Sequence, residues 1–374
     1  MVGRVAGTPE GTVTVEYAVT DGTASQKSDY TFVSGTVSDA RIASTVKAEP
    51  LTFAPGESSK TITVLISEDG FAEGTEQLTV TLSNPKGATL GAVESATLDI
   101  VDNDVVDSDS NPIDDAQTFV CQHYHDFLHR QPDVEGLAFW TGEIERCGND
   151  AGCVEAKRAD VSAAFLLSIE FQRTSYLVYR MYDVCLERHP RYEEFVRDMH
   201  EVSRGVEVGI GDWEGQLERN TQAFTESFIN RDEFARKYAG METPEAFVGE
   251  MYEYAEVEPS EEDFQAAVGI YGLGGPMGKA RAMRMILDEP PVFNRFYNGG
   301  FVMAQYFGYL RRDPDGAPDV DMSGYDYWLG KLDGFSRVDE DVRDEATALG
   351  RIRRAEMVHA FISSAEYRQR FGLR

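Results

Sequence analysis

The sequence predicts a multidomain protein in which an antiparallel β-sandwich precedes an all-α domain. Up to about Asp104, apolar and polar residues alternate between Gly and Pro punctuation, which is the pattern of half-buried strands. The clearest alternating set is Val13, Val15, Tyr17 and Val19. From Pro112 onward apolar residues recur at helical spacing, and the run before it is polar. We therefore expect a sandwich at 1–105, a linker at 106–114 and a helical domain at 115–374.

The composition favours a soluble protein of two or three domains and argues against some partners. The chain has 374 residues, 42% of them hydrophobic, and its 65 acidic and 35 basic residues give a net charge of -30. Affinity for nucleic acid comes largely from Lys and Arg, so we expect no nucleic-acid partner. No apolar run is long enough to span a bilayer, and residues 1–6 lack signal-peptide features, so any export signal would lie upstream.

Acidic residues gather at one end of the predicted sandwich. The loop 67–76 joins two strands and carries four carboxylates and no Lys or Arg. Because successive strands run antiparallel, the strand that ends near residue 101 brings two more to the same end. The six residues are Glu68, Asp69, Glu73, Glu76, Asp102 and Asp104. One solvated acidic loop would need no ligand, but two converging loops of oxygen ligands favour Ca²⁺ over Mg²⁺.

Several short motifs in this region occur in a defined order. They are Asp21-Gly-Thr-Ala24, Ser28-Asp-Tyr30, Ser34-Gly-Thr36, Leu51-Thr-Phe-Ala-Pro-Gly-Glu57, Glu68-Asp-Gly-Phe-Ala-Glu-Gly-Thr-Glu76 and Ile100-Val-Asp-Asn-Asp104. The set closely resembles the Calx-beta domain, an immunoglobulin-like calcium-binding sandwich of sodium/calcium exchangers, integrin β4 and bacterial surface proteins. The resemblance implies Ca²⁺ as the cofactor and a backbone carbonyl ligand near Phe71. The implied side-chain ligands are Asp29, which joins by resemblance alone, and Glu68, Asp69, Glu73, Glu76, Asp102 and Asp104.

Two features depart from the Calx-beta pattern. The family's first strand has no counterpart before Val2, and an insert runs from Val37 to about Pro50. A sandwich without that strand is expected to expose an edge of unpaired backbone groups. The edge could be filled by the insert, whose stretch Arg41–Lys47 has strand-like composition, by an upstream segment, or by a strand from a neighbouring molecule. Our hypothesis is donation between copies, which would build a ring or a filament.

The helical region contains about four weakly similar units. Leu128-His-Arg-Gln-Pro-Asp133 is echoed by Leu310-Arg-Arg-Asp-Pro-Asp315, and Ala164-Phe-Leu-Leu-Ser-Ile-Glu-Phe171 by Ala360-Phe-Ile-Ser-Ser-Ala-Glu-Tyr367. These phrases resemble a bacterial family called domain of unknown function 4214, over about residues 115–372. That resemblance implies an extracellular setting and supplies no catalytic residues.

The four cysteines predict one disulfide. Cys147 and Cys153 flank a short polar loop that a disulfide can close, and no further soft ligands at zinc spacing lie nearby. Cys121 and Cys185 lie in apolar helical stretches and are expected to be buried thiols, although a bridge between them stays open.

Other groups invite chemical interpretations that we weigh as weaker. His123, His125 and His129 have partly metal-like spacing, but the last repeat replaces two of them with Phe307 and Arg311, so we expect solvated or partly packed histidines. The acidic run 313–321 lacks the final Glu of an EF-hand loop, and we expect a turn that caps the next helix. Because no nucleophile or metalloprotease motif appears, we expect no enzyme.

These features predict a secreted or cell-surface calcium-binding structural protein that binds partners or copies of itself, in adhesion, a surface layer or a filament. The alternative is an extracellular enzyme or carbohydrate-binding module in which calcium only supports the scaffold. A deep pocket of carboxylates with shifted pKa values in the helical region would favour the alternative.

Overall fold

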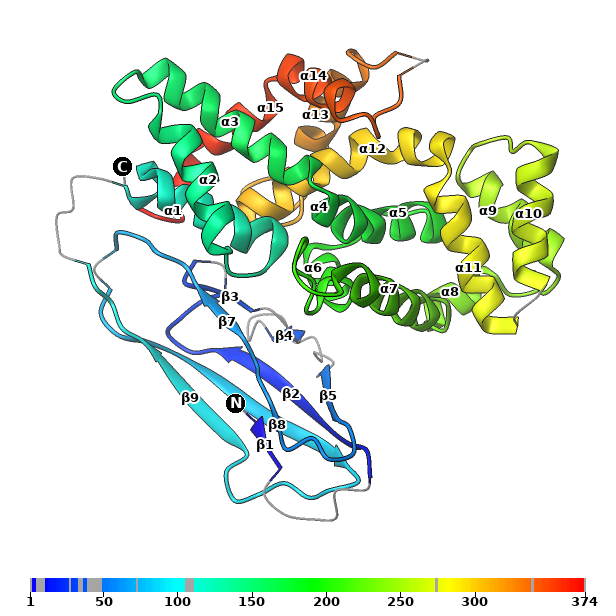
Figure 1. Ribbon diagram of the computed structural model, residues 1–374, viewed down its shortest axis with the longest axis horizontal. Coiled ribbons are helices and arrows are strands. Elements are labelled where there is room, and N and C mark those ends of the chain that lie inside the picture. The colour runs from blue at the N-terminus through cyan, green and yellow to red at the C-terminus, as the bar shows by residue number, and fades with distance from the viewer. Residues whose placement is uncertain are drawn as a thin grey trace. The chain divides into compact units, whose positions relative to one another are not determined.

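The computed structural model describes residues 2–4, 11–26, 28–32, 36–38, 49–71, 73–104, 111–272, 275–337 and 340–372. The chain forms two compact units. The first comprises Met1–Lys157 and Ile362–Arg374, and the second comprises Arg158–Phe361. The N-terminal part of the first unit is built of strands, and the rest of the chain is mostly helical (Figure 1).

The larger sheet is organised around a long central strand (Figure 1). Strand β2 (Val13–Asp21) pairs antiparallel with β8 (Glu76–Lys86), and β8 pairs antiparallel with β9 (Ser95–Ile100). The other edge of β2 is shared by β4 (Thr36–Ser38), which is parallel to it, and β5 (Glu49–Phe53), which is antiparallel. The predicted antiparallel return from β8 to β9 is thereby confirmed.

Two short antiparallel pairs complete the β region. Strand β3 (Tyr30–Phe32) pairs with β7 (Val64–Ile66), and β1 (Val2–Gly3) pairs with β6 (Ser59–Lys60). The prediction that the family's first strand has no counterpart before Val2 stays a prediction, because residues 1 and 5–10, on either side of β1, fall outside the described residues. Both described ends of the insert, in β4 and β5, lie along β2, whereas 39–48, which includes Arg41–Lys47, falls outside the described residues.

The core of the sandwich follows the period-two pattern. All four predicted inward residues of β2 are buried, and Tyr17 and Val19 pack with Tyr30 and Leu78. Each residue between them is half-buried, because alternate side chains of a strand point to opposite faces. Ile62 and Val64 pack against this core, as the alternation predicts.

The helices form four related copies, each of which begins with a helix, a tight turn and two further helices. One short closing helix follows in the first and second copies, and two short helices follow in the fourth. In the first copy they are α1 (Ala116–His123) with its π-helical end η2 (Tyr124–Leu128), α2 (Val134–Glu145), α3 (Ala151–Leu167) and α4 (Ile169–Arg173). The second has α5 (Ser175–Leu186), α6 (Tyr192–Ser203), α7 (Trp213–Ile229) and α8 (Asp232–Lys237). The third has α9 (Pro244–Tyr254), α10 (Glu261–Gly272) and α11 (Gly275–Asp288). The fourth has α12 (Pro290–Gln305) with its π-helical end η3 (Tyr306–Leu310), α13 (Ser323–Asp333), α14 (Glu345–Ala355), α15 (Met357–Ile362) and α16 (Ala365–Arg368).

The turn after each first helix identifies the four copies. A left-handed residue lies at the end of the first helix in every copy, with φ values of 49, 51, 48 and 48° at His129, Glu187, Glu256 and Arg311. It is the C-cap in three copies and follows the C-cap Ala255 in the third. A proline stands three positions later, at Pro132, Pro190, Pro259 and Pro314. A left-handed residue ends a helix, and proline cannot continue one but can precede the next. The same combination of a left-handed residue and a following proline therefore occurs four times.

The described part of the predicted linker is ordered. Residues Pro112–Asp114 form a short 3-10 helix, η1, and the buried Asn111 caps it by accepting a hydrogen bond from the backbone N–H of Ile113. The side chain of Asn111 also donates to the carbonyl of Arg368, 3.0 Å away. Polar residues predicted a linker at 106–114, but one of them, Asn111, is buried and caps a helix.

Cys147 and Cys153 form a disulfide with their Cα atoms 5.5 Å apart, whereas Cys121 and Cys185 are free thiols. The pairing matches the prediction and leaves the other two cysteines unbridged. Among the helices that the structure describes, none has both the length and the apolar character needed to cross a membrane.

Candidate metal centre

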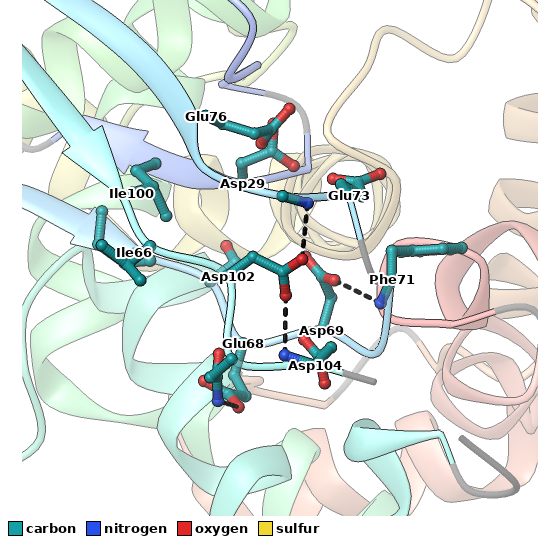
Figure 2. Close-up of a pocket in the computed structure, with 14 residues that line it drawn as sticks. Asp29, Ile66, Glu68, Asp69, Phe71, Glu73, Glu76, Ile100, Asp102 and Asp104 are labelled. Atoms are coloured by element: carbon teal, nitrogen blue, oxygen red, sulfur yellow. Dashed lines mark hydrogen bonds between the residues drawn. The ribbon is translucent and has the colours of Figure 1, made fainter. Parts of the chain in front are cut away.

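A cavity of about 150 Å³ lies at the acidic end of the sandwich (Figure 2). All seven predicted ligand residues line it. They come from three places in the sequence: the turn before β3, the loop between β7 and β8, and the segment after β9. No Lys or Arg is among the 14 residues that line the cavity.

The pairing of β3 with β7 explains how Asp29 reaches the cavity. Asp29 precedes β3, and Tyr30 pairs with Ile66 at the end of β7. The backbone N–H of Ser67 donates to the carbonyl of Asp29 at 2.9 Å, which extends this pairing by one residue. The Asp29 side chain is buried and accepts a hydrogen bond from the backbone N–H of Ser25. The resemblance alone placed Asp29 at this end, and strand pairing supplies the physical reason.

The loop between β7 and β8 is shaped by its own carboxylates. Asp69 accepts a hydrogen bond from the backbone N–H of Phe71 at 2.9 Å, in a turn of the kind that Asp favours. Gly74 has φ of +80°, a conformation that glycine adopts without strain, and its N–H donates to Asp102 at 2.6 Å. Glu76 then opens β8.

The segment after β9 is tied to this loop. Asp102 accepts a second hydrogen bond, from the backbone N–H of Asp104 at 2.8 Å, and these backbone donors lower the pKa of Asp102. The side-chain amide of Asn103 donates to Glu68 at 3.0 Å. Asp102 therefore stays charged while it holds both loops in place.

Three carboxylates converge most closely. Asp29, Glu73 and Glu76 each present an oxygen within 4.8 Å of the other two, and Figure 2 shows Asp29 beside Glu76. Burial, together with the neighbouring Asp29, raises the pKa of Glu76 to about 7. Burial and the charges of Asp29 and Asp102 also raise the pKa of Glu73. Like charges at this distance disfavour full ionisation unless a cation lies between them.

The pKa values of Asp69 and Asp104 are raised for the same reasons. Burial raises the pKa of Asp69 to about 7, with further contributions from Glu73, Asp29 and Asp104. The pKa of Asp104 is raised by burial and by Glu68 and Asp102. The cavity is thus an anionic site whose carboxylates would be relieved of repulsion by a bound cation.

The donor chemistry fits calcium. Carboxylate oxygens predominate, and Phe71, whose carbonyl was expected to contribute, also lines the cavity. Ser67 lines it as well, is only 7% exposed, and its hydroxyl has no hydrogen-bond partner among the described residues. Ca²⁺ takes six to eight oxygen ligands in flexible geometry, so such a set suits it better than the strict octahedron of Mg²⁺.

The acidic run 313–321 in the fourth helical copy surrounds the positively charged side chain of Arg312. The guanidinium of Arg312 donates to the carbonyls of Asp313 and Gly316 and to the side chain of Asp319, at 3.0, 2.9 and 2.9 Å. The predicted turn that caps α13 is met only in part: Asp321 accepts from the backbone N–H of Ser323, the first residue of α13, but the N-cap residue Met322 makes no side-chain cap hydrogen bond.

The three histidines are packed rather than solvated. His123, His125 and His129 are all buried, and His123 lies 2.7 Å from the carbonyl of Phe119. His125 lies 3.7 Å from the sulfur of Cys121. Burial raises the pKa of the Cys121 thiol, which disfavours its reactive thiolate form. Of the two outcomes expected, solvated or partly packed, the packed one holds, because all three side chains are buried. The ring of His123 contacts those of Phe119 and Phe127.

The family comparisons agree with the two regions. Residues 1–104 match the Calx-beta domain, and residues 108–175 match the Domain of unknown function (DUF4214). The two matches follow one another in the order that the motifs predicted, and the second covers only residues 108–175 of the predicted 115–372. Calx-beta domains are associated with calcium binding. No curated protein matches the chain.

Proposed function

We propose that this chain is a non-catalytic, calcium-binding structural protein of the cell surface or extracellular space, in which the Calx-beta domain binds Ca²⁺ and the helical copies contact other proteins. The observation that carries the proposal is the cavity lined by seven carboxylates and by no Lys or Arg. The disulfide between Cys147 and Cys153 supports an oxidising compartment.

In this role Asp29, Glu73 and Glu76 would provide the closest set of ligands, and the remaining carboxylates would complete the shell. Bound calcium neutralises the crowded charges and links three segments distant in sequence. A ligand that binds only the folded state stabilises it, by about 2.7 kcal/mol when free ligand is a hundred times Kd. Calcium would therefore act as a structural staple.

The test compares thermal unfolding in calcium, in magnesium and in EDTA. We expect calcium to raise the unfolding midpoint most, and Glu73→Ala to reduce that rise because it removes a ligand. Glu94→Ala is the matched control, since it removes one exposed acid of the same domain outside the cavity. Equal midpoints in calcium and EDTA for the unaltered chain would contradict the proposal.

One observation favours the alternative of carbohydrate binding by the helical region. Phe139 and Tyr327 are exposed on equivalent helices of the first and fourth copies, and each makes an edge-on contact with the adjacent tryptophan, Trp140 or Trp328. Exposed aromatic faces can stack on sugar rings. Retention of the chain on an insoluble polysaccharide, in EDTA as well as in calcium, would decide for this alternative.

A further inference from the structure

Strand β9 forms an edge of the larger sheet (Figure 1). Among the described residues it pairs only with β8, and all its side chains except that of Ile100 are exposed. The opposite edge, along β2, is occupied by β4 and β5. Among the described residues, no strand therefore pairs with the backbone groups on the outer side of β9, whereas β4 and β5 cover the opposite edge of the sheet.

The hydrogen-bond register identifies these outward groups. Leu82 lies opposite Glu94 and donates its backbone N–H to the Glu94 carbonyl at 2.7 Å, so this is a hydrogen-bonded pair. Hydrogen-bonded and non-hydrogen-bonded pairs alternate along an antiparallel ladder. The backbone N–H and C=O groups of Ser95, Thr97 and Asp99 consequently point away from β8.

The core face of β9 is incompletely covered. Leu98 lies opposite Leu78 and shares its face, yet Leu78 is 0% exposed and Leu98 is 37% exposed. Val93 and Val101, which flank the strand, are also exposed. A further strand beside β9 would shield Leu98 as well as satisfying the backbone groups.

This edge lacks several of the features that protect edge strands from further pairing. Proteins protect such strands with charged side chains, especially Lys, and with Pro, bulges or very short length. The segment 91–104 contains no Lys, Arg or Pro, and β9 pairs with β8 over six residues without a register shift. Glu94 and Asp99, which lie outside the metal cavity, give this edge a negative charge that complements a basic partner.

We propose that β9 is a strand-addition site that receives an extended, basic segment of a partner polypeptide. The segment pairs its backbone with Ser95, Thr97 and Asp99, places small or β-branched side chains over Leu98, and carries Lys or Arg toward Glu94 and Asp99. This interaction mode draws affinity from main-chain hydrogen bonds and selectivity from alternate side chains. It requires no calcium, and so it extends beyond the function proposed above.

The experiment measures binding of a fluorescein-labelled peptide, Lys-Thr-Val-Thr-Val-Thr-Lys, to the full chain by fluorescence anisotropy. Control peptides carry Pro at the centre or Glu at both ends. We expect binding of the first peptide only, with slower amide exchange at Ser95, Thr97 and Asp99. Measurement in EDTA and in calcium separates this proposal from the calcium proposal, because peptide binding is expected in both.

Variants of Thr97 test the backbone contact. Thr97→Pro removes an outward N–H and no bond to β8, so we expect affinity for the peptide to fall at least about tenfold. Thr97→Ala keeps that N–H and should bind as the unaltered chain does. Asp99→Lys retains every backbone N–H and C=O group. It should weaken binding of the basic peptide and allow binding of the peptide with Glu at both ends.

Three outcomes would overturn the proposal. The first is no binding of the basic peptide, and the second is binding that Thr97→Pro leaves unchanged while the chain stays folded. The third is concentration-dependent dimerisation that Thr97→Pro abolishes and the peptide does not affect, which would make a second copy of β9 the occupant.

Discussion

The raised pKa values of Asp69 and Glu76 link protonation to stability and to the proposed calcium binding. Both have a pKa of about 7, above the ordinary value of a carboxyl group, with burial as the first cause. In the folded chain without metal they hold protons that the unfolded chain has already released, so folding is favoured below the unfolded pKa and loses this contribution as pH rises through about 7. Calcium requires the deprotonated forms, so its affinity should change in the opposite direction.

We therefore expect the unfolding midpoint in EDTA to fall between about pH 5 and pH 8, and the gain from added calcium to grow over the same interval. Asp69→Asn removes one of the two titrating groups and should flatten the decline in EDTA. Differential scanning calorimetry at several pH values measures both trends. A decline of equal slope in Asp69→Asn would show that other groups cause it.

The sequence predicted six of the seven carboxylates from strand direction, and the reason is geometric. Glu68, Glu73 and Asp102 follow or precede strands whose order fixes the end at which they emerge. Asp29 required knowledge that β3 pairs with β7, which no local pattern encodes. Ser67 was missed because a serine between strand and loop has no distinctive signal.

At the scale of elements, the helical copies are recognisable because each has the same turn, with a left-handed residue followed by a proline. The sequence predicted about four units from side-chain phrases, and the left-handed residue with its following proline defines them more sharply. The similarity extends to packing: Gly136 of α2 faces the hydroxyl of Tyr124, and Gly324 of α13 faces that of Tyr306. The equivalence of Gly136 and Gly324 is hard to recognise in the sequence, because more residues separate the proline from α13 in the fourth copy than from α2 in the first.

Substitution of these glycines should therefore be costly. A Cβ on Gly324 would lie 2.5 Å from the Tyr306 hydroxyl, so we expect Gly324→Ala to destabilise the chain by about 1–3 kcal/mol. Tyr306→Phe removes that oxygen, and in its background the same substitution should cost less. Urea denaturation gives both free energies of unfolding.

Gly330→Ala is the matched control in the same helix, where an added Cβ meets no heavy atom within 4 Å. It should be neutral or stabilising by up to about 1 kcal/mol, because alanine favours helix more than glycine does. Similar losses at the two positions would mean that the contact with Tyr306 is not the cause.

At the scale of the molecule, the C-terminal residues belong to the first unit and reach both of its parts. Arg370 forms a two-pronged ion pair with Asp126 of η2, with both distances 2.9 Å and side-chain exposures of 5% and 1%. The carbonyl of Phe371 accepts a hydrogen bond from the backbone N–H of Gly70, within the loop that carries Asp69 and Glu73. The sequence offered no sign of these contacts, because each joins residues more than 200 positions apart and depends on the finished fold.

The buried pair gives the last prediction. Arg370→Met leaves the Asp126 carboxylate buried without its guanidinium, and breaking such a pair costs about 3–5 kcal/mol. Arg368→Met is the matched control, since its pair with Asp114 is much more exposed, at 29% and 50% of the side chains, and should cost at most about 1 kcal/mol. If the double variant Asp126→Leu with Arg370→Met recovers most of the loss, the cost belongs to the Asp126 charge left buried without Arg370. Because Phe371 holds Gly70, Arg370→Met should also reduce the rise in unfolding midpoint caused by calcium, and Arg368→Met should leave it nearly unchanged. A rise in unfolding midpoint of equal size in both variants would show that the C-terminal contact does not support calcium binding by the loop between β7 and β8.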